Sequence, residues 1–308
     1  MNNIINKNKD LEAQTVKNIK NSKSFNTIRA YKSDLQTFSV FCNSLNLNSL
    51  PASPKTISLF ITHLSKNSKY STIKRKLAAI KVSHKLAGQY IDLKNPIISE
   101  NLISIKKQIG TYQKSKKPIL IRDLKLIINE IESEIDIKIK LRNKSLILVG
   151  FSGAFRRSEI ISIEIDDIEF VNEGVKIFLK KSKTDQTGEG MIKALPYFDN
   201  EFYCPVRNLK KWINYLSNTK NKSKKIFDMS DKNVSLIIKK YVNKIGLNPQ
   251  IYSGHSLRSG FATSAAENNV EERHIMNMTG HKSNQMVRRY IQEGNLFKNN
   301  ALKKLNFK

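Results

Sequence analysis

The residues best suited to carry chemistry lie in two stretches near the end of the chain, GHSLRSG at 254–260 and TGHKSNQMVRRY at 279–290. Together they hold two histidines, three arginines and a tyrosine in a chain that is otherwise crowded with lysine. An arginine guanidinium is planar and binds two oxygens of one anion in parallel, which a lysine ammonium cannot do. The two stretches therefore indicate a site for an oxyanion, with phosphate as the first candidate.

The distribution of arginine supports this interpretation. The chain is rich in Asn, Ile and Lys together, a composition that can reflect coding bias, so arginine is the more informative cation. Five of the 11 arginines fall in the segments 153–159, 254–260 and 280–290, where uniform scatter would place about one. These five are Arg156, Arg157, Arg258, Arg288 and Arg289. Their clustering indicates anion recognition rather than charge alone.

Two of these segments can place an arginine on a defined element. In HSLR, the three-residue spacing puts His255 and Arg258 on one face of a helix. If the helix begins just before it, His255 lies at the amino end, which favours an anion. In GAFRRSE, Arg156 follows an apolar run, where a guanidinium needs an anion or a carboxylate partner such as Glu159. A surface helix with incidental polar residues and an internal Arg/Glu pair remain the alternatives.

Tyr290 is one of ten tyrosines, and a tyrosine by itself is more often a core or rim residue than a nucleophile. Its phenol, with an ordinary pKa of about 10, becomes useful against a phosphodiester only where cations neutralise the phosphate and favour the phenolate. The neighbouring arginines and histidines would supply that setting.

The order of these residues, with nine positions from His281 to Tyr290, resembles the tyrosine recombinase, or phage integrase, family. Two further stretches, SFNTIRAYKSDLQTFSVFC and STIKRKLAAIKVSHKLAG, are similar to the helical core-binding domain of that family. The resemblance extends over about residues 24–295. The residues of the catalytic set that carry it are Arg156, Lys183, His255, Arg258, His281 and Tyr290.

For the reaction, the resemblance implies that Tyr290 attacks a scissile phosphate, which gives a 3′-phosphotyrosine and frees a 5′ hydroxyl. Lys183 would protonate the leaving oxygen. Lys180 and Lys181 alternate with it along the same predicted hairpin, so one of them could be the acid instead. His255 would act as general base or as a phosphate ligand.

The resemblance also implies that Arg156 and Arg258 bind the non-bridging oxygens, that His281 donates a further hydrogen bond, and that Glu159 orients this group. No metal ion and no ATP is expected, because arginines neutralise the phosphate and the covalent ester stores the bond energy. The implied activity is that of a site-specific DNA recombinase or integrase. Two other functions remain open: a type IB topoisomerase-like enzyme that relaxes DNA, and a non-catalytic DNA-binding module.

The formal net charge of +28 indicates a polyanionic partner, with nucleic acid ahead of an acidic membrane. We expect double-stranded DNA target sites and a homotetramer on paired sites. No apolar run approaches the roughly 20 residues of a membrane span, and no signal peptide is evident, so we expect a cytoplasmic, nucleoid-associated protein. The residues expected to contact DNA are Arg29, Lys74, Arg75, Lys81, Arg157, Lys181, Arg288 and Arg289. Salt bridges are the alternative for Arg157, Arg288 and Arg289.

The elements that must hold these residues form two domains, and the expected fold class is mainly α with a small antiparallel β-sheet. Residues 1–118 hold 21 Lys and Arg against 5 Asp and Glu, so the smaller part is the more basic per residue. The expected divisions are a polar tail over 1–20, a helical core-binding domain over 21–112, a linker over 113–118 and a catalytic domain over 119–308.

In the first domain, apolar residues spaced by three and four predict four helices. The first follows Ser24, and the second has a Ser53 cap with Pro54 at its first position. The third starts on a possible Ser71 cap, and the fourth covers about 97–109.

Beyond the linker, the pattern predicts helices at IRDLKLIINEIES, SLILVGFSGA and five later stretches. Three strands are predicted from EIISIEIDDIEF, VKIFLKK and MIKALPY, the last two as a hairpin whose turn carries Lys183. After Tyr290, apolar residues at helical spacing predict a tail helix that docks on a neighbouring subunit or on its own domain.

Overall fold

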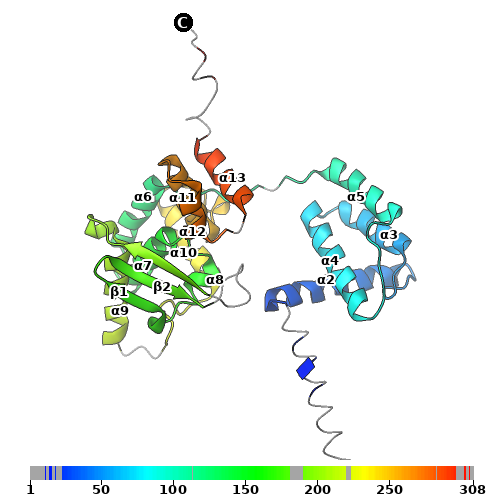
Figure 1. Ribbon diagram of the computed structural model, residues 1–308, viewed down its shortest axis with the longest axis horizontal. Helices are drawn as coiled ribbons and strands as arrows, with labels where there is room; N and C mark the ends of the chain where they lie inside the picture. Colours follow the sequence, from blue (N-terminus) through cyan, green and yellow to red (C-terminus); the bar gives the residue numbers. More distant parts are fainter. Residues whose placement is uncertain are drawn as a thin grey trace, which may run out of the picture. The chain divides into compact units, whose positions relative to one another are not determined.

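The computed structural model describes residues 11, 14–15, 18, 23–112, 114–180, 190–219, 223–281, 283–295, 302 and 305. The chain divides into two compact units, Met1–Lys114 and Ser115–Lys308 (Figure 1). Each unit has its own hydrophobic core. The division falls inside the basic stretch that the sequence marks as a linker.

The N-terminal unit is a bundle of helices, and the polar side chains of Ser24, Ser53 and Asn95 cap three of their starts. The side chains of Ser24 and Ser53 accept hydrogen bonds from the backbone nitrogens three residues on. The expected Ser71 cap is wrong: the third helix begins at Tyr70, and the backbone carbonyl of Lys69 accepts its first hydrogen bonds. The helices are α2 (Phe25–Ser44), α3 (Pro54–Ser65), α4 (Tyr70–Leu86) and α5 (Pro96–Ile109).

The core of this unit is made by the apolar faces of all four helices. Phe60 of α3 packs against Phe38 and Phe41 of α2, with ring centroids 4.9 and 5.1 Å away. Buried His84 of α4 accepts a hydrogen bond from the backbone nitrogen of Ala52 at 2.9 Å, so its other ring nitrogen donates to the Ile80 carbonyl. These contacts fix α4 against the loop before α3.

The C-terminal unit combines helices with a three-stranded antiparallel sheet in the order β1-β2-β3. Mainly α with a small antiparallel sheet is therefore the confirmed fold class. Its helices are α6 (Ile121–Glu132), α7 (Ile137–Ser152), α8 (Arg157–Ile160), α9 (Pro205–Asn218), α10 (Asp231–Lys244), α11 (His255–Glu267), α12 (Glu272–Thr279) and α13 (Asn284–Asn295). Its strands are β1 (Ile168–Val171), β2 (Gly174–Leu179) and β3 (Met191–Pro196).

The predicted strand over 159–170 is wrong at its beginning, because most of that stretch is turns and short helices. Carboxylates cause the difference. Glu159 accepts a hydrogen bond from the backbone nitrogen of Arg156 at 2.8 Å, and Asp167 accepts one from Glu164 at 3.0 Å. Such local bonds offer the backbone an alternative to a strand. Only Ile168–Val171 joins the sheet.

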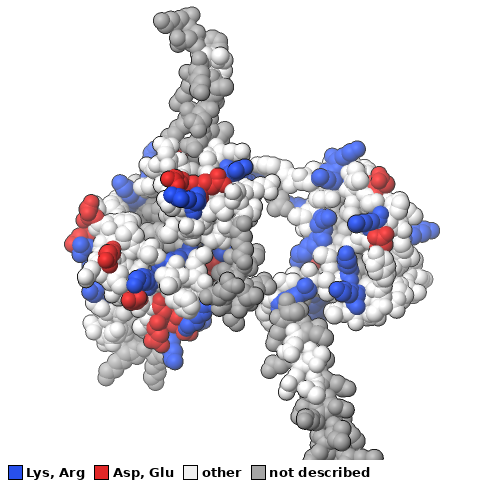
Figure 2. Space-filling model, in the orientation of Figure 1, with Lys and Arg blue, Asp and Glu red and all other residues white. Residues whose placement is uncertain are grey.

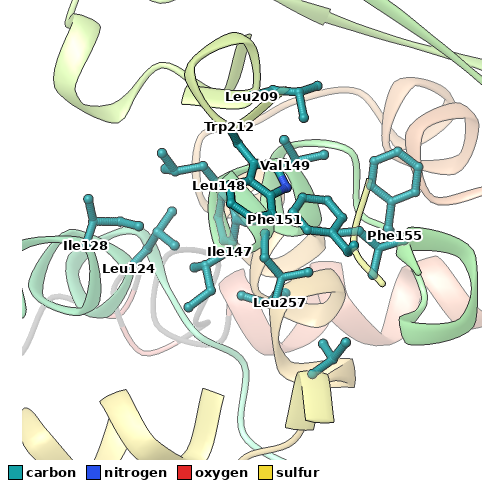
Figure 3. Close-up of a cluster of buried hydrophobic side chains, with 14 of the residues drawn as sticks. Leu124, Ile128, Ile147, Leu148, Val149, Phe151, Phe155, Leu209, Trp212 and Leu257 are labelled. Atoms are coloured by element: carbon teal, nitrogen blue, oxygen red, sulfur yellow. The ribbon is translucent and has the colours of Figure 1, made fainter. Parts of the chain in front are cut away.

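The core of this unit surrounds α7, whose residues from Leu146 to Val149 are fully or almost fully buried. Figure 3 shows side chains from α6, α9 and α11 gathered around this helix, among them Leu124, Trp212 and Leu257. Trp212 also donates a hydrogen bond from its ring nitrogen to the Ile226 carbonyl at 2.8 Å. Leu257 packs in this core, so the next residue of α11, Arg258, lies at the edge of the core.

The segment before α6 docks on α11 of the same unit. The backbone nitrogen of Ile119 donates to the Ser256 carbonyl at 2.9 Å. A Cβ atom at Gly260 would lie only 1.9 Å from the carbonyl oxygen of Ile119. The last residue of the GHSLRSG stretch is therefore a glycine because another part of the backbone passes against it.

Surface charge differs between the units. In Figure 2, most charged side chains on the visible face of the N-terminal unit are Lys or Arg, whereas the C-terminal unit shows both signs side by side. No described helix is both long enough and apolar enough to span a bilayer.

Candidate active site

Arg156 lies in the turn between α7 and α8, and its own glutamate holds it there. Glu159 is 3% exposed, and its carboxylate accepts from the Arg156 guanidinium at 2.5 Å and from the Arg156 backbone nitrogen at 2.8 Å. The internal Arg/Glu pair that the sequence allowed is thus present. It uses Nη1 of Arg156 and fixes the orientation of the planar guanidinium.

Arg258 is the most deeply buried cation of the site, with 1% of its surface exposed. Its Nη1 donates to the carbonyl of Ala154 at 2.9 Å, and Ala154, just after helix α7, has a positive φ of 48°. Its Nη2 has no hydrogen-bond partner among the residues that the structure describes. Burial, and then Arg156, lower the pKa of Arg258 to about 10. A buried cationic donor without a partner is costly, and an anion would satisfy it.

His255 and Tyr290 meet across the same site. Helix α11 begins at His255, as the sequence suggested, and α13 carries Tyr290. The Nε2 atom of His255 lies 3.2 Å from the Tyr290 hydroxyl oxygen. The Tyr290 ring packs on a small cluster that includes Ala262 of α11 and Ile275 of α12. Tyr290 therefore lies beside His255 of its own chain.

His281 follows α12, which ends at Gly280 in the left-handed conformation with φ 61°. The Thr279 hydroxyl donates to the Ile275 carbonyl at 2.6 Å, so it must accept the hydrogen bond that links it to His281 Nδ1 at 2.8 Å. The Nδ1 atom of His281 consequently carries a hydrogen. When the ring is neutral, its Nε2 atom presents a lone pair.

Electrostatics favour this neutral form. Burial first, and then Arg258 and Arg156, lower the pKa of His281 to about 4. The ring lies 6.0 Å from the Tyr290 ring at an interplanar angle of 27°. Without an anion in the site, His281 is therefore uncharged near neutral pH and donates only to Thr279.

Lys193 is a residue that the sequence reasoning missed. It lies on β3, is 3% exposed, and donates hydrogen bonds to the carbonyls of Gly153 and Met278. One available signal was the alternation of MIKALP, which places Lys193 on the same face of the strand as buried Leu195. A lysine at an inward position of a strand is unusual enough to single out.

The proposed general acid, Lys183, lies outside the described residues, as does Lys181. Lys180 is described, and it pairs with Glu164 at 2.6 Å and Asp167 at 2.9 Å. These partners raise its pKa, with the Glu164 hydrogen bond as the largest cause. The two ion pairs thus favour the charged form of Lys180. Among the described residues, no group of three His, Cys, Asp or Glu side chains could hold a metal ion.

The expected DNA contacts that the structure describes, all but Lys181, fall into two groups. Arg29, Lys74, Lys81 and Arg289 have exposed side chains. The others have acidic or polar partners: Arg75 pairs with buried Asp34 at 3.2 Å, Arg157 hydrogen-bonds Ser235 at 2.9 Å, and Arg288 lies 3.6 Å from Glu272. The salt-bridge alternative is therefore present for Arg288, and Arg157 has Asp231 at 3.8 Å as well.

Both units of the chain are similar to known proteins. Residues 121–295 match the phage integrase family, and residues 18–88 match the N-terminal SAM-like domain of phage integrases. An integrase/recombinase XerD homolog of Selenomonas ruminantium is 40% identical in an alignment of 314 positions, which covers 98% of this chain and 91% of the relative. Tyrosine recombinase XerC of Rickettsia typhi is 30% identical over 292 residues, which cover 87% of each chain.

Solved structures share the fold at lower identity. The XerH recombinase, in a post-cleavage complex with its difH substrate, superposes with a TM-score of 0.61 at 18% identity, over 82% of this chain and 71% of that one. A lambda integrase dimer bound to a core site gives 0.59 at 15% identity, over 93% and 76%. The chain belongs to the phage integrase family of tyrosine recombinases.

Proposed function

We propose that this tyrosine recombinase cleaves and rejoins duplex DNA at specific sites through a covalent ester on Tyr290. The phenol oxygen attacks the scissile phosphorus, a new O–P bond forms, and the bond to the 5′ oxygen breaks. The tyrosine gives up its proton and the 5′ oxygen gains one. Because one phosphodiester replaces another, rejoining is the same exchange with an incoming 5′ hydroxyl and needs neither ATP nor metal.

The observation that carries this proposal is the unfilled donor of Arg258. Its Nη2 is buried without a partner among the described residues, Arg156 and Tyr290 act electrostatically on its guanidinium, and the Tyr290 hydroxyl faces His255. A phosphate bound there would accept from Arg258 and Arg156 and would repay the cost of burying the guanidinium. The two arginines would then stabilise the charge that grows as the nucleophile adds.

His255 is the proposed base for Tyr290. The 3.2 Å separation of its Nε2 from the hydroxyl oxygen lies within the range for direct proton transfer. His281 has a different proposed role: the arriving phosphate would favour protonation of its ring, and Nε2 would then donate to a non-bridging oxygen while Thr279 accepts from Nδ1.

Lys183 remains the proposed donor of the proton to the 5′ oxygen, on the strength of the family resemblance. The ion pairs of Lys180 with Glu164 and Asp167 make that neighbour a poorer donor, because they favour its charged form. Glu159 is proposed to orient Arg156 through the two hydrogen bonds that it accepts.

The test of this function is covalent capture. The protein is incubated with a library of randomised duplexes, denatured, and sequenced for the DNA that stays attached. We expect an adduct with the parent chain and with Tyr215→Phe, a control tyrosine stacked on Trp212 away from the site. We expect none with Tyr290→Phe, which should still bind the recovered DNA. An adduct that survives in Tyr290→Phe would exclude this tyrosine as the nucleophile.

Double-stranded DNA is the proposed partner, and a homotetramer on two paired sites is the proposed assembly, in the cytoplasm with the nucleoid. The solved relatives include complexes with DNA. A plasmid that carries two recovered sites distinguishes recombination from relaxation alone: deletion or inversion products support a recombinase, whereas topoisomers without them indicate a topoisomerase.

A further inference from the structure

Lys193 is buried at a place where the charged ammonium form is energetically disfavoured. It is 3% exposed on the inner face of β3, and the cations Arg156 and Arg258 act on it. Two backbone carbonyls accept its hydrogen bonds, and its Nζ lies 4.9 Å from the centre of the Phe155 ring. Burying a lysine beside arginines requires a compensating role.

The two carbonyls belong to different parts of the proposed site. Gly153 lies in the turn that leads from α7 to Arg156, and its carbonyl oxygen is 2.5 Å from Lys193 Nζ. Met278 lies in the last turn of α12, three residues before His281, and its carbonyl accepts a second hydrogen bond from the same nitrogen. One side chain therefore links the segment of the arginine to the segment of the histidine.

We propose that Lys193 is a positioning residue for strand cleavage, whose side-chain nitrogen sets the separation between the Arg156 turn and the His281 turn. This inference rests on the proposed function. Both carbonyls lie at the carboxyl end of a helix, Gly153 directly after α7 and Met278 in the last turn of α12, where the last backbone carbonyls lack partners within the helix. Lys193 supplies both of these carbonyls with one shared donor. Sub-ångström placement of phosphate ligands matters because a displacement of about 1 Å can cost about 100-fold in rate.

The charge of Lys193 couples this constraint to phosphate binding. Burial lowers its pKa to about 7, Arg258 and Arg156 act in the same direction, and Glu159 opposes them. His281 is the fourth titratable group in its surroundings. A bound phosphodiester adds negative charge and raises the pKa of Lys193, so the ammonium form, which is the stronger hydrogen-bond donor, prevails in the complex. Cleavage should therefore decline as the pH rises through this higher value.

A proton donor would behave differently from a positioning residue. If Lys193 gave its proton to the 5′ oxygen, replacing that oxygen by sulfur would restore cleavage to a variant without the ammonium, because a thiolate leaves unprotonated. A positioning defect is not restored, since the phosphate ligands stay misplaced whichever atom leaves.

The experiment compares Lys193→Met and Lys193→Arg with the parent, on nicked duplexes that carry a site recovered by covalent capture. Lys176→Met is the matched control, because Lys176 lies on the adjacent strand β2 with a half-exposed side chain paired to Glu169. Rates of adduct formation are measured at saturating DNA from pH 6 to 10, with 5′ oxygen and 5′ sulfur substrates, alongside DNA affinity and thermal unfolding.

We expect Lys193→Met to form adduct roughly 10- to 100-fold more slowly, with DNA affinity within about threefold and no restoration by sulfur. Lys193→Arg, which keeps charged donors, should recover most of the rate and lose the decline at high pH. Lys176→Met should match the parent within about twofold. If Lys193→Met does not fold, the rate and pH profile of Lys193→Arg decide the question.

Three results would overturn the role of Lys193: a folded Lys193→Met with a rate near that of the parent, restoration by sulfur, or a Lys193→Arg profile that declines as the parent does. If the parent itself forms no adduct with any duplex, the proposed function has failed instead. The two failures are therefore distinguishable.

Discussion

Arg258 uses one guanidinium nitrogen for its own fold and keeps another for a ligand. Nη1 is bonded to the Ala154 carbonyl, and Nη2 is without a partner among the described residues. A lysine cannot hold that carbonyl and a phosphate oxygen in the same fixed plane. Arg258→Lys should therefore lose about 100-fold or more in the single-turnover rate of adduct formation. Arg142→Lys, a half-buried arginine on α7, is the control; a loss below about fivefold in Arg258→Lys would contradict the role.

Thr279 determines which nitrogen of His281 faces the site. Its oxygen accepts from Nδ1, and a hydrogen bond to the charged ring is stronger than one to the neutral ring by about 1 kcal/mol. Thr279→Val removes the acceptor with little change of shape, so the pKa of His281 should fall by about one unit. If cleavage needs the charged ring, the decline that belongs to His281, at lower pH than the decline that belongs to Lys193, should begin about one unit earlier. Thr279→Ser keeps the acceptor and should follow the parent; an unchanged Thr279→Val profile would show that the ring acts uncharged.

The residues that could be predicted from the sequence are those whose type is rare in this chain. Arginines are few against 43 lysines, so Arg156 and Arg258 attracted notice by clustering. Lys193 has the commonest side chain, and its importance depends on carbonyls from Gly153 and Met278 that only the folded chain brings together. Thr279 was not predicted for a related reason, because its effect on His281 depends on the direction of the hydrogen bond between them.

Among the elements, α11 shows how tightly the site is built into the fold. Gly260 lies in the middle of this helix, where alanine would by propensity alone be better by about 1 kcal/mol. The Ile119 carbonyl lies 1.9 Å from the place that a Cβ atom would occupy, and overpacking costs about 1–3 kcal/mol or more. Gly260→Ala should therefore lower the melting temperature despite the better propensity. Lys232→Ala, at an exposed position on α10, is the control; a stabilised Gly260→Ala would mean that the 117–119 segment moves aside without cost.

Helices were predictable where apolar spacing reflects burial, whereas the places where helices and strands begin were harder to predict. Helices of both units were found from apolar spacing, because burial against a core imposes that period. The strand expected over 159–170 failed because Glu159 and Asp167 bond to nearby backbone nitrogens, and residue spacing alone does not reveal such bonds. The predicted start of α4 was wrong: the helix begins at Tyr70, and a serine close to the start of a helix is not always its cap.

For the molecule as a whole, the net charge of +28 predicts DNA affinity that depends steeply on salt. Lys74 has an exposed side chain on α4, in the unit whose visible charged side chains are mostly basic (Figure 2). If it neutralises one phosphate, Lys74→Ala should reduce the slope of log affinity against log salt concentration by about one. Lys244→Ala should leave the slope unchanged, because Lys244 is paired with Glu130 at 2.9 Å and Glu134 at 3.5 Å. Fluorescence anisotropy of a labelled duplex between 50 and 400 mM salt, a range of roughly one decade, measures both. Equal slopes for Lys74→Ala and the parent would show that the charge of Lys74 serves solubility rather than DNA binding.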